Sequence, residues 1–357
     1  MIIIVGAGLS GLLTAYLLKK EGIPFKILEA RDRIGGRINT IYKTKKAPID
    51  LGATWFTNQH LQLITLLKEL GIEYFEQSLD NKVYYESSEI SPVQLVQIPS
   101  QSPSYRISGG SLTLINSLID KLDETDILLN QSVKHIKINT NSIQVNSDEA
   151  FECNSIVLAI PPKLWSKKIA FDPVLPTNLM NVATQTQTWM EDSIKVALTY
   201  DQPFWKKENL SGTLFSNIGP ITEFYDHSNH NKSRYALCGF MNTDLNKSSY
   251  TDRRKVVIKQ LINIFGQRAA EYNDYEECIW SNEENTFEYS ENFLIPHQNN
   301  GNPIFNNSVF NGKVLISSTE SASNFPGYME GAVISANKTA IELIKENRLI
   351  NPINFKS

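Results

Sequence analysis

A glycine-rich turn between an apolar strand and a helix opens the chain, and it restricts the fold more than any other feature. The sequence "MIIIVGAGLSGLLTAYLLKKEGIPFKILEA" begins with a β-branched run, turns at Gly6, Gly8 and Gly11, and continues in a pattern typical of a helix. A second strand-like run occupies residues 25–29. Strand, turn, helix and strand within about 30 residues predict a βαβ unit, the building block of a doubly wound parallel sheet.

The three glycines form a G-x-G-x-x-G pattern in which each has its own physical task. Gly6 permits the tight turn, Gly8 lets the backbone approach a pyrophosphate, and Gly11 lets the helix lie close to the strand. Glu29 ends the second strand about 20 residues later, where a carboxylate binds ribose hydroxyls. A plain tight turn with a surface acid is the alternative, but it leaves the register of these parts unexplained. We therefore expect a dinucleotide site.

The segment after Glu29 indicates which dinucleotide is bound. "EARDRIGGRINT" places Arg31, a glycine pair at Gly35 and Gly36, and then Arg37 directly after the acid. Bare backbone and a guanidinium offered from this second side suit the pyrophosphate of an extended FAD molecule. A solvated basic loop would explain the arginines but not the paired glycines.

Later segments predict a second domain. "SVKHIKINTNSIQVN" alternates like a β-hairpin, and residues 156–160 are typical of a buried parallel strand. The middle third changes character, with strands at 193–200 and 234–241 and one long amphipathic helix at 251–269. Residues 79–105 are Ser-rich and interrupted by prolines, and we expect a polar connection there. An α/β pattern returns near the C-terminal end.

Composition and charge exclude several classes of partner. The net charge of −4 and the interspersed acids and bases leave no basic surface for nucleic acid. No apolar run approaches the roughly 18–20 residues of a membrane span, so no membrane partner is expected. Three widely spaced cysteines without a CxxC pair fit a reducing compartment, and we predict a cytoplasmic protein. His227 and His230 stand in the polar stretch "YDHSNHNKS", where a chance H-x-x-H in a loop is favoured over a metal site, so no metal is expected.

With these segments in order, the chain resembles the flavin-dependent amine oxidase family, which includes monoamine oxidases, polyamine oxidases and related histone demethylases. The resemblance extends over nearly the whole chain. It is carried by "VGAGLSGL", "EARDRIGGR", "DLGATW", "RISGGS", "LAIPP", "SIKVALTYDQPFW", the segment around Trp280 and "STESASNFPGYMEGAV". Each segment alone is modest, but their shared order is specific, and "GYMEGAV" is most similar to monoamine oxidases.

The resemblance implies a two-domain α/β fold. A Rossmann-like FAD-binding domain would carry a discontinuous second α+β substrate-binding domain, as in p-hydroxybenzoate hydroxylase. We expect the FAD-binding domain in residues 1–76, 105–166 and 300–345, the substrate-binding domain in 77–104 and 167–299, and a C-terminal tail in 346–357. The implied activity is hydride transfer from an amine to flavin N5; the resulting imine hydrolyses to an aldehyde and ammonia or an amine, and O2 is reduced to H2O2.

The resemblance also implies catalytic residues. Lys195, a lone charge in the strand "SIKVALTY", would act beside the flavin, although alternation alone would also place it on a wet face. Tyr328 would face the substrate, with Tyr289 as its aromatic partner and Phe287 as a competitor for that place. Trp280 would lie near the flavin or simply in the core.

The remaining cofactor contacts implied by the resemblance lie in several segments. Glu320 would reach the ribityl chain, and the helix from Met329 would direct its N-terminus at the pyrimidine end of the flavin. No cysteine stands near either C-terminal segment, so the FAD is expected to be non-covalent. The other expected contacts are Ser10, Ala30, Gly52, Ala53, Thr54, Trp55 and Val133.

Two departures from the family pattern leave alternatives open. Ser318 stands where the family has glycine, and its side chain would either crowd the flavin or add a hydrogen bond. The segment at 74–105 is much shorter than the insertion of monoamine oxidases, which implies a more open site. A related oxidase or desaturase with a non-amine substrate, an amino-acid oxidase using Arg106 or Arg234, and a non-catalytic flavoprotein are the alternatives. The oligomeric state stays open.

Overall fold

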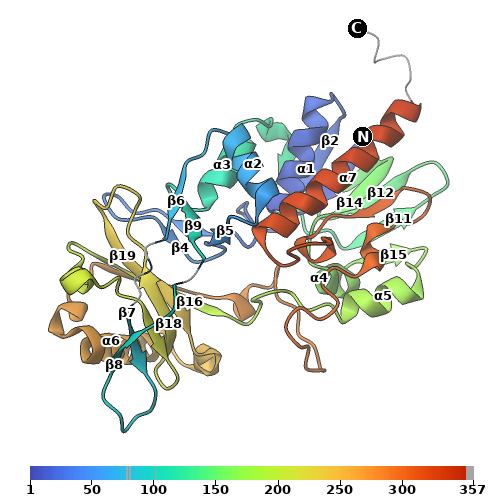
Figure 1. Cartoon of the computed structure of the whole chain (residues 1–357). Helices are drawn as coiled ribbons and strands as arrows, with labels where there is room; N and C mark the ends of the chain where they lie inside the picture. Colours follow the sequence, from blue (N-terminus) through green and yellow to red (C-terminus); the bar gives the residue numbers. More distant parts are fainter. Residues whose placement is uncertain (78, 80–81, 101, 351–357) are drawn as a thin grey trace.

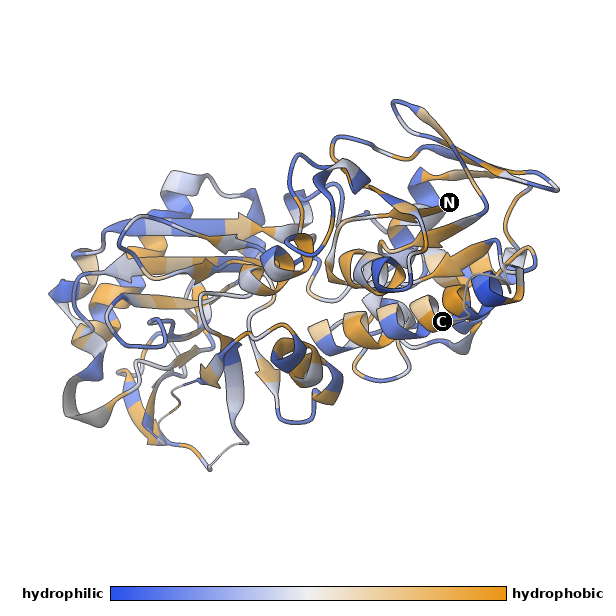
Figure 2. Ribbon diagram, turned by 90° about the horizontal axis from the view of Figure 1, so that it is seen from above, coloured by the Kyte–Doolittle hydropathy of each residue, from blue (hydrophilic) through white to orange (hydrophobic). Residues whose placement is uncertain are grey.

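The computed structural model describes residues 1–77, 79, 82–100 and 102–350. Figure 1 shows two domains, one containing α1, α7 and β14 and the other containing β16, β18, β19 and α6. Seen from above, the domains lie side by side, with apolar strands inside each (Figure 2). No helix among the described residues is long and apolar enough to cross a membrane.

The first domain is built on a five-stranded parallel sheet. The order of its strands is β10, β2, β1, β14 and β21, so the βαβ unit lies at its centre and the prediction of a parallel sheet is confirmed. These strands are β1 (Ile2–Val5), β2 (Phe25–Leu28), β10 (Ile127–Leu128), β14 (Ser155–Leu158) and β21 (Val314–Ile316).

Two different layers cover this sheet because its strands are apolar on both faces. Ile2 and Ile4 pack against the helices α1 (Leu9–Lys20), α2 (Leu61–Glu69), α3 (Leu112–Ile119) and α7 (Met329–Ile350). Ile3 and Val5 face the other layer, which contains a four-stranded sheet and two helices. That layer consists of β11 (His135–Ile138), β12 (Ile143–Asn146), β13 (Ala150–Cys153), β15 (Ala170–Asp172), α4 (Pro162–Lys168) and α5 (Thr177–Thr184). The predicted hairpin is the antiparallel pair β11–β12.

The second domain is a seven-stranded sheet with one long helix against it. The strand order is β20, β16, β19, β18, β17, β7 and β8, and only the β17–β7 pair is parallel among these described strands. The strands are β7 (Lys82–Glu86), β8 (Gln94–Gln97), β16 (Ile194–Tyr200), β17 (Leu214–Ser216), β18 (Ile221–Asp226), β19 (Tyr235–Met241) and β20 (Asp274–Ile279). The helix is α6 (Tyr250–Phe265).

Short strands connect the two domains. They form the pair β3–β4 and the three-stranded sheet β5–β9–β6. Their bounds are β3 (Thr40–Ile41), β4 (Ile49–Asp50), β5 (Phe56–Thr57), β6 (Tyr74–Glu76) and β9 (Ser104–Ile107). Ile49 and Leu51 pack against Ala197 of β16, which places the β4 segment directly on the substrate-domain sheet.

Three sequence expectations differ from the structure. The stretch at 79–105 holds the hairpin β7–β8 and strand β9 rather than a plain connection, since β7 gains a partner in the distant strand β17. The helix expected at 251–269 ends at Phe265, because Gly266 takes a φ of 83° and a short 3-10 turn follows. Helix α7 continues to Ile350, past the expected start of the tail, and residues 351–357 lie outside the described residues. The domain boundaries themselves stay a prediction.

Candidate functional site

The glycine turn has the geometry of a phosphate cradle. A side chain on Gly11 would place its Cβ 2.0 Å from the Gly6 carbonyl oxygen, so only glycine lets α1 pack this closely. A Cβ on Gly8 would meet nothing nearer than the Gly36 Cα at 4.0 Å, so the space beside this bare backbone is open to a ligand. Gly8 is also the N-cap of α1 and offers no side-chain cap, which leaves the first N–H groups of the helix for an anion.

Glu29 closes one end of the cradle. Its Oε2 accepts a hydrogen bond from the Ala7 N–H at 2.8 Å, and its Oε1 accepts one from the Arg31 N–H at 3.0 Å. A carboxylate has about four lone-pair positions, so both oxygens can still accept from ribose hydroxyls. The Arg31 guanidinium donates to Glu283 and Thr286.

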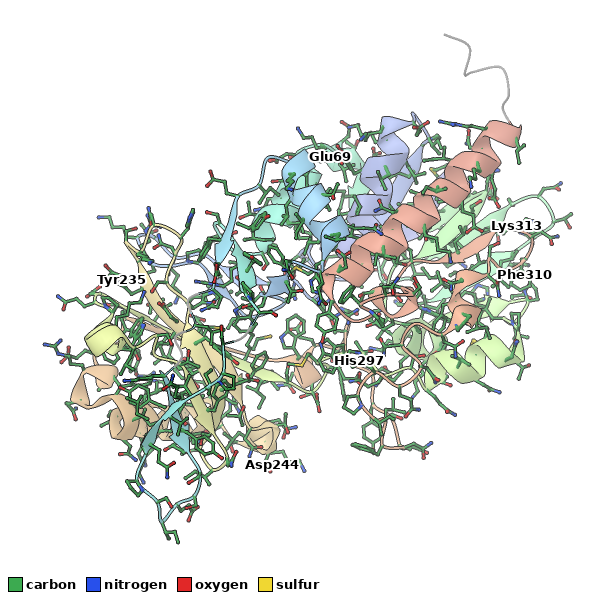
Figure 3. The ribbon with its side chains drawn as sticks, in the orientation of Figure 1. Glu69, Tyr235, Asp244, His297, Phe310 and Lys313 are labelled. Atoms are coloured by element: carbon green, nitrogen blue, oxygen red, sulfur yellow. The ribbon has the colours of Figure 1, made fainter. Side chains whose placement is uncertain are left out.

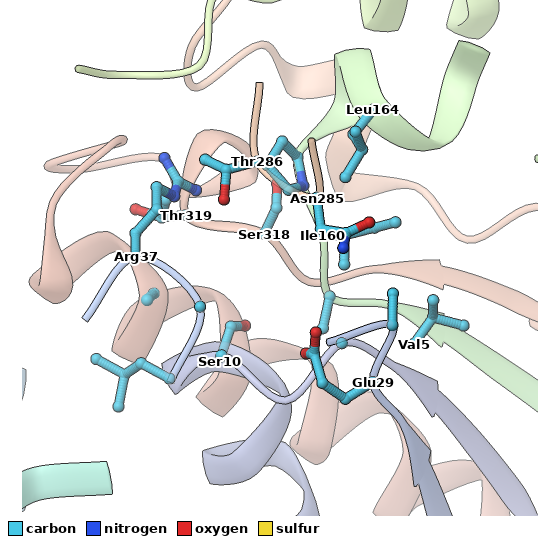
Figure 4. A pocket seen from close by; sticks show the side chains of 18 of the residues that line it. Val5, Ser10, Glu29, Arg37, Ile160, Leu164, Asn285, Thr286, Ser318 and Thr319 are labelled. Atoms are coloured by element: carbon cyan, nitrogen blue, oxygen red, sulfur yellow. The ribbon is translucent and has the colours of Figure 1, made fainter. Parts of the chain in front are cut away.

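A long cavity extends from Glu29 past the glycine turn to Arg37 and Tyr328. It holds about 1070 Å³ of empty space, and Figure 4 shows Glu29, Ser10, Ser318 and Arg37 along it. Expected cofactor residues that line it are Gly6, Gly8, Ser10, Glu29, Ala30, Arg31, Gly35, Gly36, Arg37, Ala53, Val133 and Met329. Gly11 stands behind the wall as a packing residue.

Arg37 and Glu320 form an ion pair at the far end of the cavity. Arg37 Nη1 donates to Glu320 Oε1 at 2.6 Å and Nη2 donates to Oε2 at 3.1 Å, a bidentate arrangement. Glu320 is fully buried and is not among the residues that line the cavity, and its contact with the ribityl chain stays a prediction. Its carboxylate orients the guanidinium, which lines the cavity.

A second cavity continues from the first, with about 990 Å³ of empty space. The two share Arg37, Ala53, Thr286, Gly327, Tyr328 and Met329, so they form one continuous space. We call the second part the chamber. Expected residues that line it are Gly52, Ala53, Thr54, Trp55, Lys195, Trp280 and Tyr328.

Lys195 enters the chamber from β16, the second strand from one edge of the substrate-domain sheet. Ile194 and Val196 face the core beneath α6, so strand alternation turns Lys195 toward the FAD-binding domain. The side chain is only 2% exposed, which excludes the wet-face alternative. Its Nζ donates to the Gly52 carbonyl oxygen at 2.6 Å and also to the Thr54 hydroxyl. An ammonium has three donors, so one remains for a ligand or water in the chamber.

The surroundings of Lys195 disfavour its charged form. Burial lowers the pKa of Lys195 below its ordinary value, and the Arg106 guanidinium lowers it as well, against the opposing effects of Cys238 and Asp50. The Nζ lies 4.6 Å from the centre of the Trp55 ring, which partly compensates the lost hydration.

Tyr328 stands where the two cavities meet, and two aromatic side chains support its ring. Trp189 stacks on His297 with 3.9 Å between ring centres, and each lies 6.0 Å from the Tyr328 ring. Figure 3 shows His297 near the junction of the domains. Burial lowers the pKa of His297, so the stack favours a neutral imidazole. Trp189 lines the chamber and was not singled out from the sequence, although it immediately precedes the Lys195 strand.

Tyr289 does not take the expected place opposite Tyr328. It is 66% exposed and lines neither cavity, while its backbone oxygen accepts a hydrogen bond from Lys167 at 2.6 Å. Phe287 lines neither cavity and lies 5.6 Å from Lys163 Nζ. Thr286, which the sequence reading missed, is the member of this segment that reaches both cavities.

Glu223 is the acidic side chain of the chamber wall. It lines the chamber and also a smaller outer pocket with about 430 Å³ of empty space, so it lies at their boundary. Trp55 and Phe240 line both spaces too. Tyr225 donates a hydrogen bond to Glu223 Oε2, and no ion pair of Glu223 occurs among the described residues. No sequence signal marks this residue.

Several other residues named in the sequence analysis do not line the cavities. Arg106 is buried and donates to the Ser228 carbonyl oxygen at 2.6 Å, whereas Arg234 is exposed and donates to Lys46 O at 3.3 Å. His227 is buried rather than part of a solvated loop, and its Nε2 accepts from the Asp50 N–H at 3.2 Å. Within the described ranges no group of three or more potential metal ligands occurs.

This arrangement fits FAD. The bare glycine backbone and the α1 N-terminus suit a pyrophosphate, Glu29 suits a ribose, and the cavity leads past Arg37 to an aromatic chamber. None of the described residues lining either cavity is a cysteine, which keeps non-covalent FAD as the expectation. Fold and site together define a two-domain FAD-dependent oxidoreductase.

Comparisons with known proteins identify the family. The family profile described as "Flavin containing amine oxidoreductase" matches residues 9–103 and 96–344. The chain is 25% identical to a probable flavin-containing monoamine oxidase A of Dictyostelium discoideum, over 98% of each protein. It is 24% identical to a putrescine oxidase of Kocuria rosea, over 79% of this chain and 82% of that one.

Solved structures share the fold. A putrescine oxidase bound to putrescine superposes with a TM-score of 0.82 at 23% identity, covering 96% of this chain and 98% of that chain. A cyclohexylamine oxidase from Brevibacterium oxydans gives a TM-score of 0.84 at 20% identity, covering 97% and 99%. The chain belongs to the flavin-containing amine oxidoreductases, which confirms the predicted family, fold class, FAD cofactor and amine-oxidising activity.

Proposed function

We propose that this enzyme oxidises amines that carry a second positively charged group, such as linear α,ω-diamines, with O2 as the electron acceptor. The observation that carries the proposal is Glu223, an acid without an ion-pair partner among the described residues, set where the chamber meets the outer pocket. A solved relative is described as bound to putrescine, a diamine.

The two ends of the chamber suit the two ends of such a substrate. Tyr328 lies where the chamber meets the cofactor cavity and Glu223 where it meets the outer pocket, and the rings of Trp55 and Phe240 line both the chamber and the outer pocket. An apolar methylene chain packs against these rings, and a distal ammonium forms a charge-assisted hydrogen bond with the carboxylate. Tyr225 holds one carboxylate oxygen and leaves the other for the ligand.

The protein's own task in the reaction is to position the amine and keep it dry. Bound FAD supplies the two-electron oxidation of the C–N bond and the reaction with oxygen. Tyr328, supported by Trp189 and His297, gives the reacting amine a fixed aromatic face. The Lys195 ammonium lines the chamber and has one N–H beyond those bonded to Gly52 and Thr54, which is available to a ligand or a water molecule.

An amino-acid substrate fits the chamber less well. A carboxylate would need an unpaired cation, and Arg37 is already bound to Glu320. Arg106 and Arg234 line neither cavity. Glu223 would repel the carboxylate. A non-catalytic flavoprotein is disfavoured because both Lys195 and Tyr328 line the chamber.

Anaerobic reduction of the purified flavoprotein tests the proposal. A panel of monoamines, α,ω-diamines, polyamines and amino acids is mixed with the enzyme, and the loss of flavin absorbance is followed. We expect the fastest bleaching with a linear diamine. Equal or faster bleaching by a monoamine of the same length would refute the preference for a second cationic group. Bleaching by an amino acid alone would refute the assignment of simple amines as substrates. Peroxide formation in air tests the acceptor.

A further inference from the structure

Three successive hydroxyl side chains follow β21 at the cavity, and they differ in their hydrogen bonds. The Ser317 hydroxyl lies 2.8 Å from that of Ser10, and the Thr319 hydroxyl donates to the Tyr328 carbonyl oxygen at 2.7 Å. Ser318 Oγ has no hydrogen-bond partner among the described residues. The two flanking hydroxyls therefore hold the cavity wall together, and the central one does not.

Ser318 is buried in the wall of the cavity. The residue is 2% exposed and is part of the cavity wall. Figure 4 shows Ser318 beside Asn285 and Thr286, and the preceding Ser317 contacts Ser10 in the first turn of α1, so Ser318 adjoins the phosphate cradle. A buried hydroxyl without a partner is costly, so its natural partner is the molecule that fills the cavity.

Local structure does not explain this serine. Ser318 is the N-cap of the 3-10 turn Thr319–Ser321, a position where a serine hydroxyl usually accepts a backbone N–H, yet here it makes no capping bond. Its φ of −101° is open to any residue, so glycine is not needed for the backbone. Its carbonyl oxygen accepts from the N–H of Ser321 at 3.0 Å and from the Ser321 hydroxyl at 2.7 Å, which fixes the backbone.

We propose that the Ser318 hydroxyl hydrogen-bonds the ribityl diphosphate linker of FAD. The Glu29 end of the cavity suits the adenosine ribose, and the Arg37 end opens into the chamber where the flavin ring belongs. A group between these ends faces the linker, which carries hydroxyl and phosphate oxygens throughout. The serine is thus an added contact of this chain rather than an obstacle to the cofactor.

Cofactor affinity and thermal stability test the proposal without any amine. FAD is removed from the enzyme, and its Kd is measured by titrating the apoprotein of wild type, Ser318→Ala and Ser318→Gly. Loss of one hydrogen bond predicts a rise in Kd of about three- to tenfold for Ser318→Ala. The FAD-loaded variant should melt at a lower temperature than wild type, while its apoprotein should melt no lower, because the hydroxyl has no partner there.

Ser111→Ala is the matched control. Ser111 is fully buried with an unpartnered hydroxyl among the described residues, but it lines neither cavity. Its replacement should leave the Kd for FAD unchanged. Competition by ADP, which contains the diphosphate but no ribityl chain, then shows which part of the linker Ser318 contacts. Weaker ADP binding to Ser318→Ala places the contact at the diphosphate, and unchanged ADP binding places it at the ribityl hydroxyls.

Two results would overturn the inference. An unchanged Kd in Ser318→Ala would show that the hydroxyl makes no contact with the cofactor. Tighter FAD binding by Ser318→Gly would show that the side chain crowds the site. The inference depends only on FAD binding, so its failure would leave the proposed diamine activity untouched, and a failed amine panel would leave the Ser318 contact untouched.

Discussion

Replacing Glu223 by glutamine removes one negative charge from the chamber wall while keeping the size of the side chain. The carboxylate is partly buried and lines the chamber and the outer pocket. A hydrogen bond to a charged group contributes about 1.5–3 kcal/mol, and we take about 1.5–2.5 because solvent reaches this site. At about 1.4 kcal/mol per factor of ten, kcat/KM for a diamine should fall roughly tenfold to sixtyfold.

The assay compares 1,4-diaminobutane with butylamine on the same enzymes. Butylamine lacks the distal ammonium, so its kcat/KM should change by less than about twofold in Glu223→Gln. Glu271→Gln, an exposed change of the same charge in the same domain, should affect neither substrate. Equal losses for both amines, or an unchanged rate for the diamine, would refute the role of Glu223 as an ammonium site.

Three further predictions concern residues around the chamber. Lys195→Met should retain FAD but slow turnover by about tenfold or more, because the side chain lines the chamber and not the dinucleotide cavity; unchanged turnover with full flavin content would contradict this. Tyr328→Ala should impair amine oxidation far more than FAD binding, measured as kcat/KM against the Kd of the cofactor, and loss of FAD itself would make Tyr328 structural. The pKa of His227 is held well below its ordinary value by burial and by Arg106 and Lys195, so the unfolded chain binds an additional proton below about pH 6.5 and stability falls as pH drops. His227→Gln keeps an acceptor for the Asp50 N–H, and it should reduce the change in the free energy of unfolding with pH by up to about 1.4 kcal/mol per pH unit in denaturant titrations. The same pH dependence in wild type and His227→Gln would refute this role of His227.

Local geometry explains why the dinucleotide end of the site could be predicted. The roles of Gly6, Gly8 and Gly11 follow from sterics within one turn, and the roles of the strand and helix beside them follow from residue periodicity. The role of Lys195 was predicted from the family resemblance, because alternation within the strand separates its face from that of Ile194 but does not decide between a buried and a wet face. The inferences about the glycine turn need only neighbours in the chain.

The substrate end depends on contacts between distant segments. Glu223 reaches the chamber partly through an irregularity in the pairing of β18 with β19, where the register shifts between Ile221 and Glu223. Such a shift changes the face of every later side chain and leaves no trace in the residue pattern. The position of Tyr289 likewise depends on distant segments, because its backbone contacts Lys167 and its side chain is exposed.

The contact between the first and last helices sets when the enzyme can take up its cofactor. Helix α1 packs extensively against α7, and the central strand β1 reaches β21 through β14 in one sheet (Figure 1). During synthesis, the apolar face of α1 leaves the ribosome first and its covering helix last. The wall residues Ser318 and Tyr328 are added equally late. We therefore expect FAD to bind only after almost the whole described chain has been translated.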